Sequence, residues 1–308
     1  MNSDLSDPTV ARATTESGNS ALWNRVVRGV YRAGWRTVGA VPQALLRPPT
    51  AAGAALAART RGRHLTNLRL NLSVASGRLA DDRLVAAALR SYLRTLTEVL
   101  SLPRWRPDQI VSRVQVPDAP RLRHRQAESG AIVVLPHSGN WDLAGAWACL
   151  SGFPVTTVVE VLDPEAYEDF LDFRRSLGME PIGHTEPDVL SRLADALSQG
   201  RTVCLLGDRD LTRTGVWVRW AGRPVRLPAG PALLARRTGA ALIPGVCQFV
   251  DDTSMRIELD PEVDHRPGPE GLRDMTQQVA DHFAAAIRRQ PQDWPMLQPF
   301  FTGREIDR

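Results

Sequence analysis

Residues 131–142 read AIVVLPHSGNWD, and this stretch decides the fold. The apolar, β-branched run AIVVL has the length and residue types of a buried strand. A proline ends the run, His137 follows it, and a helical pattern begins near Asp142. A polar side chain between the carboxyl end of a strand and the start of a helix stands where α/β folds place their sites. The stretch therefore predicts both a sheet-based fold and the position of its site.

Strand and helix patterns alternate on both sides of this stretch. Further strands are expected at residues 155–161, 202–206, 216–220, 241–249 and 254–259. Helices are expected at residues 51–71, 81–100, 142–150, 164–177, 187–198, 229–238 and 271–289. Such alternation predicts an α/β fold with a central, mostly parallel β-sheet flanked by helices. We expect a disordered N-terminus over residues 1–20 and a single domain over 21–302, with a catalytic core at 131–250.

The charge of the chain is unevenly distributed. The 308 residues carry a net charge of +4, and all 38 basic residues are Arg. Residues 17–80 contain ten Arg and no Asp or Glu. This polarity predicts an anionic partner, and no finger, RNP or helix-turn-helix signature points to nucleic acid. Without Lys, only Arg can hold a phosphate by a fixed positive charge, and a Lys base is excluded.

Residues 21–41 form the first amphipathic pattern of the basic segment. Its aromatic and basic residues at helical spacing are Trp23, Arg25, Arg28, Arg32, Trp35 and Arg36. An Arg stripe beside Trp is typical of a helix lying in a membrane interface, so we expect contact with an anionic membrane surface. The alternative is a helix that packs on the core and keeps a solvated basic face. Pro42, then Pro48 and Pro49, are expected to end this helix.

The pair His137 and Asp142 carries the chemistry of the opening stretch. The spacing allows Asp142, in the first turn of the helix, to fold back and bond the imidazole. That bond would fix the tautomer and leave the other ring nitrogen to accept a proton from an alcohol. The helix N-terminus would add positive potential for an oxyanion or a phosphate. The alternative is a helix N-cap Asp beside a hydrogen-bonded His.

The whole string PHSGNWD resembles the first motif of the His-x4-Asp/Glu acyltransferases. The branch in question contains the bacterial lipid A biosynthesis acyltransferases and the mycobacterial phosphatidylinositol mannoside acyltransferases. Three further stretches resemble later blocks of this family: VCLLGDRDLTR at 203–213, RWAGRPVRLPAGP at 219–231 and ALIPG at 241–245. The resemblance runs from about residue 22 to 302. Asp in the first motif and the string DRDLTRTGV are closer to the mannoside enzymes.

The resemblance implies a glycerolipid-acyltransferase-like fold and a peripheral enzyme at the cytoplasmic face of the membrane. Such an enzyme moves a fatty acyl chain from acyl-CoA, a co-substrate, to a mannose hydroxyl of a phosphatidylinositol mannoside. His137 is the implied general base, with Asp142 orienting it. Asp208, one methylene shorter than the family's usual Glu, is the implied second acid, and Asp210 is the alternative. No metal pattern and no cofactor are expected.

Further residues enter through the same resemblance. Glu160 is expected to reach the pocket, and Arg174 or Arg175 matches the Arg that follows this Glu in the family; a buried Glu160–Arg174 salt bridge is the structural alternative. Arg209 is expected on the thioester oxygen or a lipid phosphate. The remaining candidates, for the CoA phosphates, are Arg223 and Arg226. The alternatives are acylation of another glycolipid or a lysophospholipid, hydrolysis of acyl-CoA, and a non-catalytic membrane-binding scaffold.

Overall fold

The sheet predicted from the sequence is the centre of the molecule. The computed structural model describes residues 37–160, 171–210 and 214–301. Within these residues, seven strands form one sheet in the order β1-β9-β8-β2-β5-β3-β4. They are β1 (Val114–Gln115), β2 (Ala131–Leu135), β3 (Val155–Val159), β4 (Glu180–Gly183), β5 (Thr202–Leu206), β8 (Ala241–Phe249) and β9 (Met255–Leu259). Every neighbouring pair is parallel except β8 and β9, so the predicted mostly parallel α/β sheet is confirmed.

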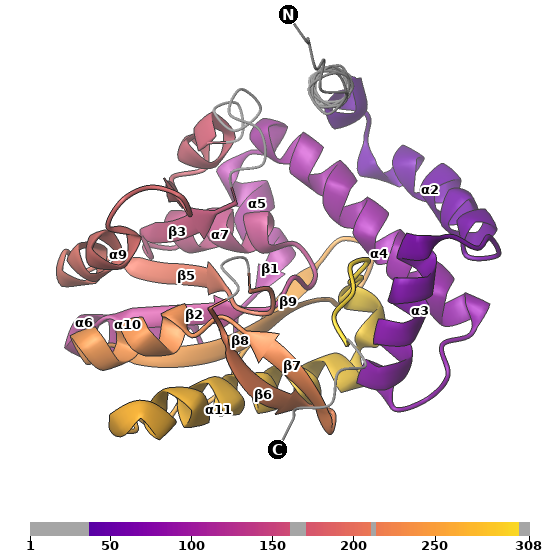
Figure 1. The fold of residues 1–308 in the computed structure, drawn as a ribbon. Helices are drawn as coiled ribbons and strands as arrows, with labels where there is room; N and C mark the ends of the chain where they lie inside the picture. Colours follow the sequence, from indigo (N-terminus) through magenta and orange to yellow (C-terminus); the bar gives the residue numbers. More distant parts are fainter. Residues whose placement is uncertain (1–36, 161–170, 211–213, 302–308) are drawn as a thin grey trace, which may run out of the picture.

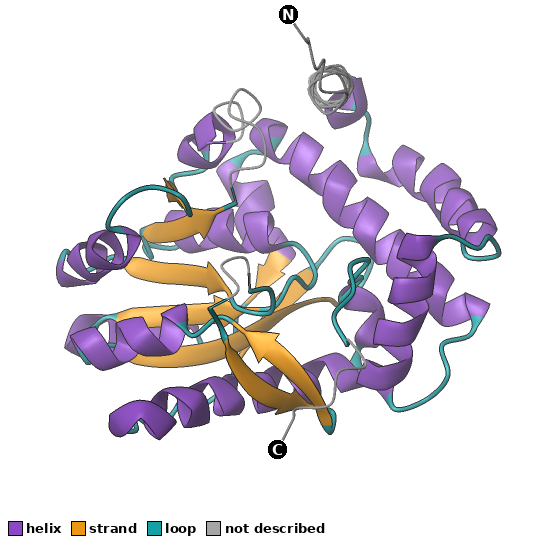
Figure 2. Ribbon diagram, viewed as in Figure 1, coloured by secondary structure: helices purple, strands orange, loops and turns teal. Residues whose placement is uncertain are grey.

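Helices cover both faces of this sheet (Figures 1 and 2). One face, with Ile132 and Val134, packs against α9 (Val189–Ser198), α10 (Gly230–Thr238) and α11 (Gly268–Arg289). The other face, with Val133 and Leu135, packs against α5 (Pro107–Arg113), α6 (Ala119–Ser129) and α7 (Trp141–Leu150). All five residues of β2 are buried. The apolar run therefore reads as continuous because alternate side chains enter two different cores.

A helical layer lies at one side of the sheet, at the right of Figure 1. It contains α2 (Gln43–Ala57), α3 (Arg63–Ser76) and α4 (Asp82–Ser101), preceded by the short η1 (Val38–Ala40). The predicted start of α4 is confirmed, since the Asp81 side chain accepts a hydrogen bond of 2.8 Å from the Leu84 N–H. The short helices η2 (Leu102–Arg104) and η3 (Pro291–Asp293) complete the described helices.

The helix predicted over residues 51–71 is divided in the structure. Gly62, in an extended conformation, separates α2 from α3. Pro48 and Pro49 lie inside α2 rather than ending a helix. Each proline removes one backbone donor, and the helix continues past both positions. The Thr50 hydroxyl there donates 2.8 Å to the Leu46 carbonyl.

Several short elements were not expected from the sequence, including β1, α5 and α6. The edge strand β4 contains Pro181, and β7 (Arg223–Leu227) contains Pro224. Proline argues against a strand in a sequence, yet edges and two-stranded ribbons accept it because one side needs no ladder donor. β7 pairs antiparallel with the predicted β6 (Val216–Trp220) as a separate hairpin.

Two predicted helices fall wholly or partly outside the described residues. Residues 1–36, which include all six predicted membrane-contact side chains, and residues 161–170 are not described. In the described ranges, no helix is both long enough and apolar enough to cross a membrane.

Candidate active site

The predicted site residues follow the carboxyl ends of three adjacent parallel strands. β3, β5 and β2 are neighbours in the sheet; Glu160 comes directly after β3, and Asp208 and His137 come two residues after the ends of β5 and β2. Leu135 pairs with Leu206 in the register of β2 and β5. Two residues further along each strand stand His137 and Asp208, at the same level of the sheet. Topology therefore brings together residues that are 71 positions apart.

His137 is bonded twice by the Asp208 carboxylate. The Nδ1 of the ring lies 2.5 Å from Oδ1, and the main-chain N–H of His137 donates to Oδ2 over 2.9 Å. Oδ2 accepts a further hydrogen bond of 2.9 Å from the indole Nε1–H of Trp294. The Asp208 side chain is fully buried, whereas that of His137 is 24% exposed. The shorter acid therefore reaches the imidazole.

These hydrogen-bond partners keep the Asp208 carboxylate ionised. Burial by itself would raise the pKa of Asp208, but the charge of His137 and the three hydrogen bonds outweigh it and hold the pKa below its ordinary value. An ionised carboxylate only accepts hydrogen bonds, so Nδ1 of the ring carries the proton. Nε2 of the neutral ring then presents its lone pair, and it has no hydrogen-bond partner within the described part of the chain. This is the geometry of an oriented general base.

The expected bond from Asp142 to His137 is wrong. The Asp142 carboxylate lies 2.8 Å from Nε of Arg174, and both side chains are more than nine-tenths buried. The N-cap of α7 is Asn140, whose side chain accepts from the Leu143 N–H over 3.0 Å. Asp142 follows in the first turn, where α7 carries it into the core beside Arg174. The acid nearest in sequence thus holds a guanidinium, and the acid on the neighbouring strand holds the imidazole.

The alternative of a buried Glu160–Arg174 salt bridge is wrong. Glu160 pairs with Arg209 at 3.2 Å, which joins the end of β3 to the turn after β5. Arg175 pairs with Asp172 at 2.9 Å on the exposed side of the helical residues 171–176. The site therefore contains Glu160 and Arg209 together.

The remaining candidates surround this turn or lie on the hairpin. Asp210 accepts 2.9 Å from the Gly215 N–H and lies 3.3 Å from the Arg226 guanidinium. Asp208, not Asp210, is therefore the acid on the imidazole. Arg223 is exposed at the start of β7.

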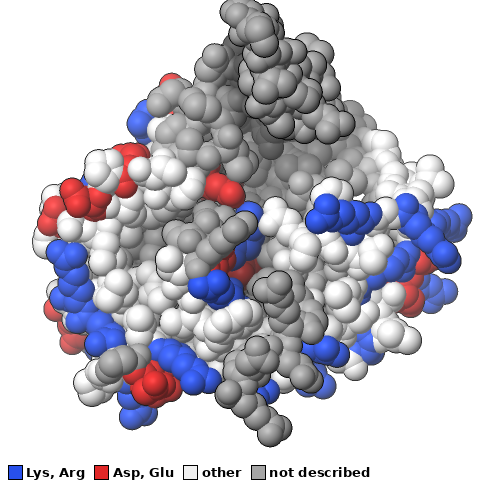
Figure 3. Space-filling view, viewed as in Figure 1, with Lys and Arg blue, Asp and Glu red and all other residues white. Residues whose placement is uncertain are grey.

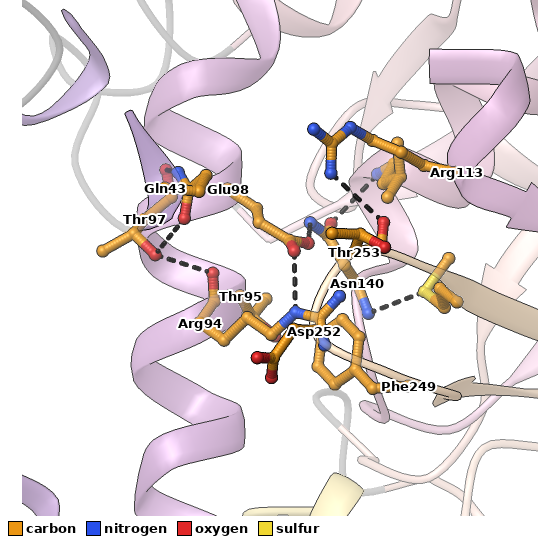
Figure 4. A network of polar contacts seen from close by, with 12 residues as sticks. Gln43, Arg94, Thr95, Thr97, Glu98, Arg113, Asn140, Phe249, Asp252 and Thr253 are labelled. Atoms are coloured by element: carbon orange, nitrogen blue, oxygen red, sulfur yellow. Dashed lines mark hydrogen bonds and ion pairs between the residues drawn. The ribbon is translucent and has the colours of Figure 1, made fainter. Parts of the chain in front are cut away.

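Residues of α4 hold the main chain that follows His137 (Figure 4). Thr95 donates to the Gly139 carbonyl over 2.8 Å, and buried Glu98 accepts 3.0 Å from the Asn140 side chain. Arg94 pairs with Glu98 at 2.7 Å, and its guanidinium lies 3.7 Å above the centre of the Phe249 ring. The loop is thus fixed by a charged network from another layer.

Gly139 makes a close backbone approach possible. Its φ is +56°, and a Cβ at this position would lie 2.6 Å from the Cys247 carbonyl oxygen on β8. Its N–H donates 2.9 Å to the Asp293 carbonyl. Only glycine meets both requirements without strain.

Sequence reasoning missed the supporting residues Arg94, Thr95, Glu98, Asp293 and Trp294. The residues on α4 lie in an ordinary amphipathic pattern, and the last two lie in a Pro-rich segment far from the motif. Neither the α4 residues nor residues 293 and 294 stand in a local sequence pattern that signals function. The motif itself contains Asn140, whose position before a helical pattern indicates an N-cap.

Two pockets lie near the pair: one has Trp141, whose ring meets that of His137 edge-on at 5.2 Å, in its wall, and the other has Asp208 in its wall. One is lined mainly by apolar side chains of β2, β3, β5, β9 and α7, with Asp142, Arg174 and Trp141 among its walls. The other is more polar and is lined by Asp208, Arg209 and Arg226 with residues of the hairpin and of segment 296–300. One side of the site therefore suits a hydrocarbon chain, and the other suits a hydroxylated or anionic group.

An oriented imidazole at the carboxyl edge of a mostly parallel sheet, within a His-x4-Asp string and beside an apolar pocket, defines an α/β acyltransferase. The model of the family described as bacterial lipid A biosynthesis acyltransferase matches residues 22–302. The chain belongs to this family, and the expected resemblance is confirmed.

Curated relatives extend the comparison. The chain is 43% identical over 292 residues to the phosphatidylinositol mannoside acyltransferase of Mycolicibacterium smegmatis, a match that covers 92% of this chain and 94% of that protein. It is 40% identical over 282 residues to the phosphatidylinositol mannoside acyltransferase of Mycobacterium tuberculosis, with 87% and 86% covered.

Proposed function

We propose that this protein transfers a fatty acyl chain from acyl-CoA to a mannose hydroxyl of a phosphatidylinositol mannoside. The observation that carries the proposal is the His137–Asp208 pair, whose unbonded Nε2 stands at the carboxyl edge of the sheet in an acyltransferase of this family. The similarity to two phosphatidylinositol mannoside acyltransferases, at 40% and 43% identity, supports the glycolipid acceptor.

The chemistry needs one base and no covalent enzyme intermediate. His137 Nε2 takes the proton of the sugar hydroxyl while the oxygen attacks the thioester carbonyl carbon. The carbon–sulfur bond then breaks, the acyl ester remains on the sugar, and the CoA sulfur takes the proton from the imidazolium. Asp208 keeps the ring in the tautomer that can accept a proton and stabilises the imidazolium that forms.

Each of the two pockets suits one of the two substrates. The apolar pocket between α7 and the sheet would take the acyl chain, and the Asp142–Arg174 pair would hold its wall. The polar pocket, beside the turn that contains Asp208, would take the sugar acceptor and direct one hydroxyl to Nε2 of His137. Arg209 and Arg226 line this pocket and are suited to a phosphodiester or the thioester oxygen. Arg223, exposed on the hairpin, is left for the CoA phosphates together with Arg226.

We further propose a peripheral position on the anionic cytoplasmic face of the membrane, where acyl-CoA is supplied. Basic side chains gather over α2 to α4, at the right of Figure 3. Exposed basic residues there include Arg59, Arg61, Arg63 and Arg78. Among them lie Leu56 and Leu79, which are 68% and 89% exposed. Exposed Leu beside Arg is the surface expected of a protein that lies on anionic lipid.

The reaction is tested with labelled palmitoyl-CoA and a lipid mixture that contains phosphatidylinositol mannosides, with the products identified by mass spectrometry. The expected product is a mannoside heavier by one acyl group, absent with His137→Ala. His124→Ala is the matched control, because His124 is exposed on α6 and bonds only Glu128 among described residues. Retained turnover in His137→Ala would overturn the proposed base.

The acceptor is tested in separate arms. Acylation of a lysophospholipid in preference to the mannoside would establish the alternative acyltransferase, and release of free palmitate without an acceptor would indicate a hydrolase. No product in any arm would favour the scaffold.

Membrane contact is tested by sedimentation with phosphatidylglycerol-containing vesicles. Replacing Arg59, Arg61 and Arg63 by Gln should weaken binding by about 1 kcal/mol for each Arg near the surface. Replacing the exposed Arg236 and Arg237 on α10 together with the exposed Arg266, a control that also removes three charges, should change it less. Equal loss in both variants would mean that only net charge matters.

A further inference from the structure

The Asp208 carboxylate is surrounded by donors from three directions. The imidazole meets Oδ1, while the His137 main-chain N–H and the indole N–H of Trp294 share Oδ2. Two of these donors belong to the residue that Asp208 positions. Trp294 supplies the third donor, from a segment 86 residues further along the chain.

Trp294 is itself held firmly. It is fully buried, and its ring stacks on Trp220 with centroids 5.5 Å apart and meets Phe300 edge-on at 4.9 Å. The residue before it, Asp293, bonds the Ser91 hydroxyl at 2.7 Å and the Phe249 N–H at 2.7 Å. Ser91 lies in α4 and Phe249 in β8, so Asp293 is bonded to two regular secondary-structure elements. The indole N–H therefore points at Asp208 from a fixed position.

Asp293 also contacts the loop that contains His137. The Asp293 carbonyl accepts the hydrogen bond of the Gly139 N–H, two residues after His137. The segment 293–294 thus contacts both partners of the pair, the loop after the base through its main chain and the acid through its indole.

We propose that Trp294 is a positioning residue of the reaction: its indole N–H holds the Asp208 carboxylate in the orientation that fixes His137 as a base. This inference rests on the proposed role of the His137–Asp208 pair and adds a member to it. Trp294 touches neither substrate nor the reacting atoms in this role and acts only through Asp208.

A comparison with the neighbouring Trp220 distinguishes this hydrogen-bonding role from a packing role. Both indoles are fully buried in the same aromatic cluster, and their planes are inclined by only 20°. The Trp220 Nε1 has no hydrogen-bond partner among the described residues, whereas that of Trp294 bonds Asp208. Replacing either Trp by Phe removes similar aromatic area, but only one replacement removes a donor from the carboxylate.

The loss of that donor should shift the pH at which the His137–Asp208 pair loses its proton in a definite direction. With a neutral imidazole the pair carries a net negative charge, which a donor stabilises more than it stabilises the uncharged imidazolium–carboxylate pair. Removing the donor therefore favours the protonated pair, and a higher pH is needed to free the base. The expected shift is on the order of one pH unit, the size set by one hydrogen bond to a charged group.

Other charged groups near Asp208 are directed elsewhere. Arg209 faces Glu160, Asp210 faces Gly215 and Arg226, and the Asp293 carboxylate faces Ser91, Phe249 and Gln290. His137 is the one titratable side chain bonded to Asp208 in the described chain.

The experiment compares kcat/KM against pH for wild type, Trp294→Phe and Trp220→Phe with labelled palmitoyl-CoA and mannoside acceptor. In Trp294→Phe the acidic limb should move upward by about one pH unit, so that kcat at pH values below both midpoints should fall on the order of tenfold. Trp220→Phe should leave the limb in place. Equal behaviour of the two variants would overturn the inference.

A double-variant comparison tests the route of action. If Trp294 acts through Asp208, adding Trp294→Phe to Asp208→Asn should produce little further change in kcat. A full additional tenfold loss would place its effect elsewhere and would also overturn the inference.

A second measurement needs no variant to retain activity. In wild-type protein the indole N–H proton resonance of Trp294, identified by its disappearance in Trp294→Phe, should titrate with the midpoint of the acidic limb. The resonance of Trp220 should not. A Trp294 resonance that is flat across the limb would refute the proposal. If instead His137→Ala keeps full activity, the proposed function fails, whatever the indole resonances show.

Discussion

Replacing Asp208 by Asn tests the site most directly, because it changes one atom without changing shape. Asp208 accepts three N–H donors, two of them at Oδ2. The Asn amide has a single acceptor atom, with lone pairs for two donors. Its oxygen can serve either the main chain and the indole or the imidazole. If the oxygen faces the two N–H groups, the NH2 group faces Nδ1 of His137.

That orientation selects the wrong tautomer. An NH2 group donates to Nδ1, so the ring carries its proton on Nε2 and cannot accept one from the sugar hydroxyl. The opposite orientation of the amide places its NH2 group against the two donors of a fully buried site. The same change of acid to amide in a Ser-His-Asp triad lowers kcat about 10⁴-fold for this reason. We therefore expect kcat to fall by about 10³- to 10⁴-fold in Asp208→Asn.

The assay is single-turnover transfer of labelled palmitate under saturating acyl-CoA, with circular dichroism to check the fold. Asp210→Asn is the matched control: it lies two residues away, and its carboxylate faces Gly215 and Arg226. It should reduce kcat far less. If Asp208→Asn keeps more than about one tenth of the wild-type kcat, the tautomer argument is wrong and Asp208 is a structural acid.

Three further predictions concern the free energy of unfolding, measured by denaturant titration. Gly139→Ala should lower the free energy of unfolding by about 3 kcal/mol, because the new Cβ meets the β8 carbonyl, while Gly239→Ala, at similar φ but in open space, should lower it by about 1 kcal/mol. Asp142→Asn should lower it by about 1.5 to 3 kcal/mol, because the buried Arg174 guanidinium loses the charged acceptor that lies 2.8 Å from its Nε; a neutral result would mean that the pair is solvated. The difference in unfolding free energy between wild type and variant should change with pH in opposite directions for Asp208→Asn and Asp293→Asn. The pKa of Asp208 is lowered by the fold, so its contribution is complete above the unfolded-chain pKa of about 3.9 and is lost as pH falls below it. Burial raises the pKa of Asp293, so its contribution is present below about 3.9 and is lost as pH rises; parallel curves would contradict both assignments.

The sequence predicts the sheet well because its strands are short, β-branched and buried on both faces. It fails where local propensity loses to context: Pro181 and Pro224 sit in edge and hairpin strands, and Pro48 lies inside a helix. The site is predicted in its members and only partly in its pairings. His137 is found from its place after a buried strand and Asp208 through the resemblance, whereas the segment with Trp294 reaches them only through tertiary packing.

The error over Asp142 has a physical origin in the way sheets and helices order their residues. A residue five positions after His137 is already in the first turn of α7, whose side chains point into the core between the helix and the sheet. There the partner of Asp142 is Arg174, from another helical segment. Residues that follow adjacent parallel strands remain at one level of the sheet, however far apart they are in the chain. Since Leu135 and Leu206 are in register, the positions two residues beyond them must meet, and these positions hold a base and an acid. Strand register therefore predicts the partner of a residue at a strand end better than sequence spacing does, once the order of strands is known.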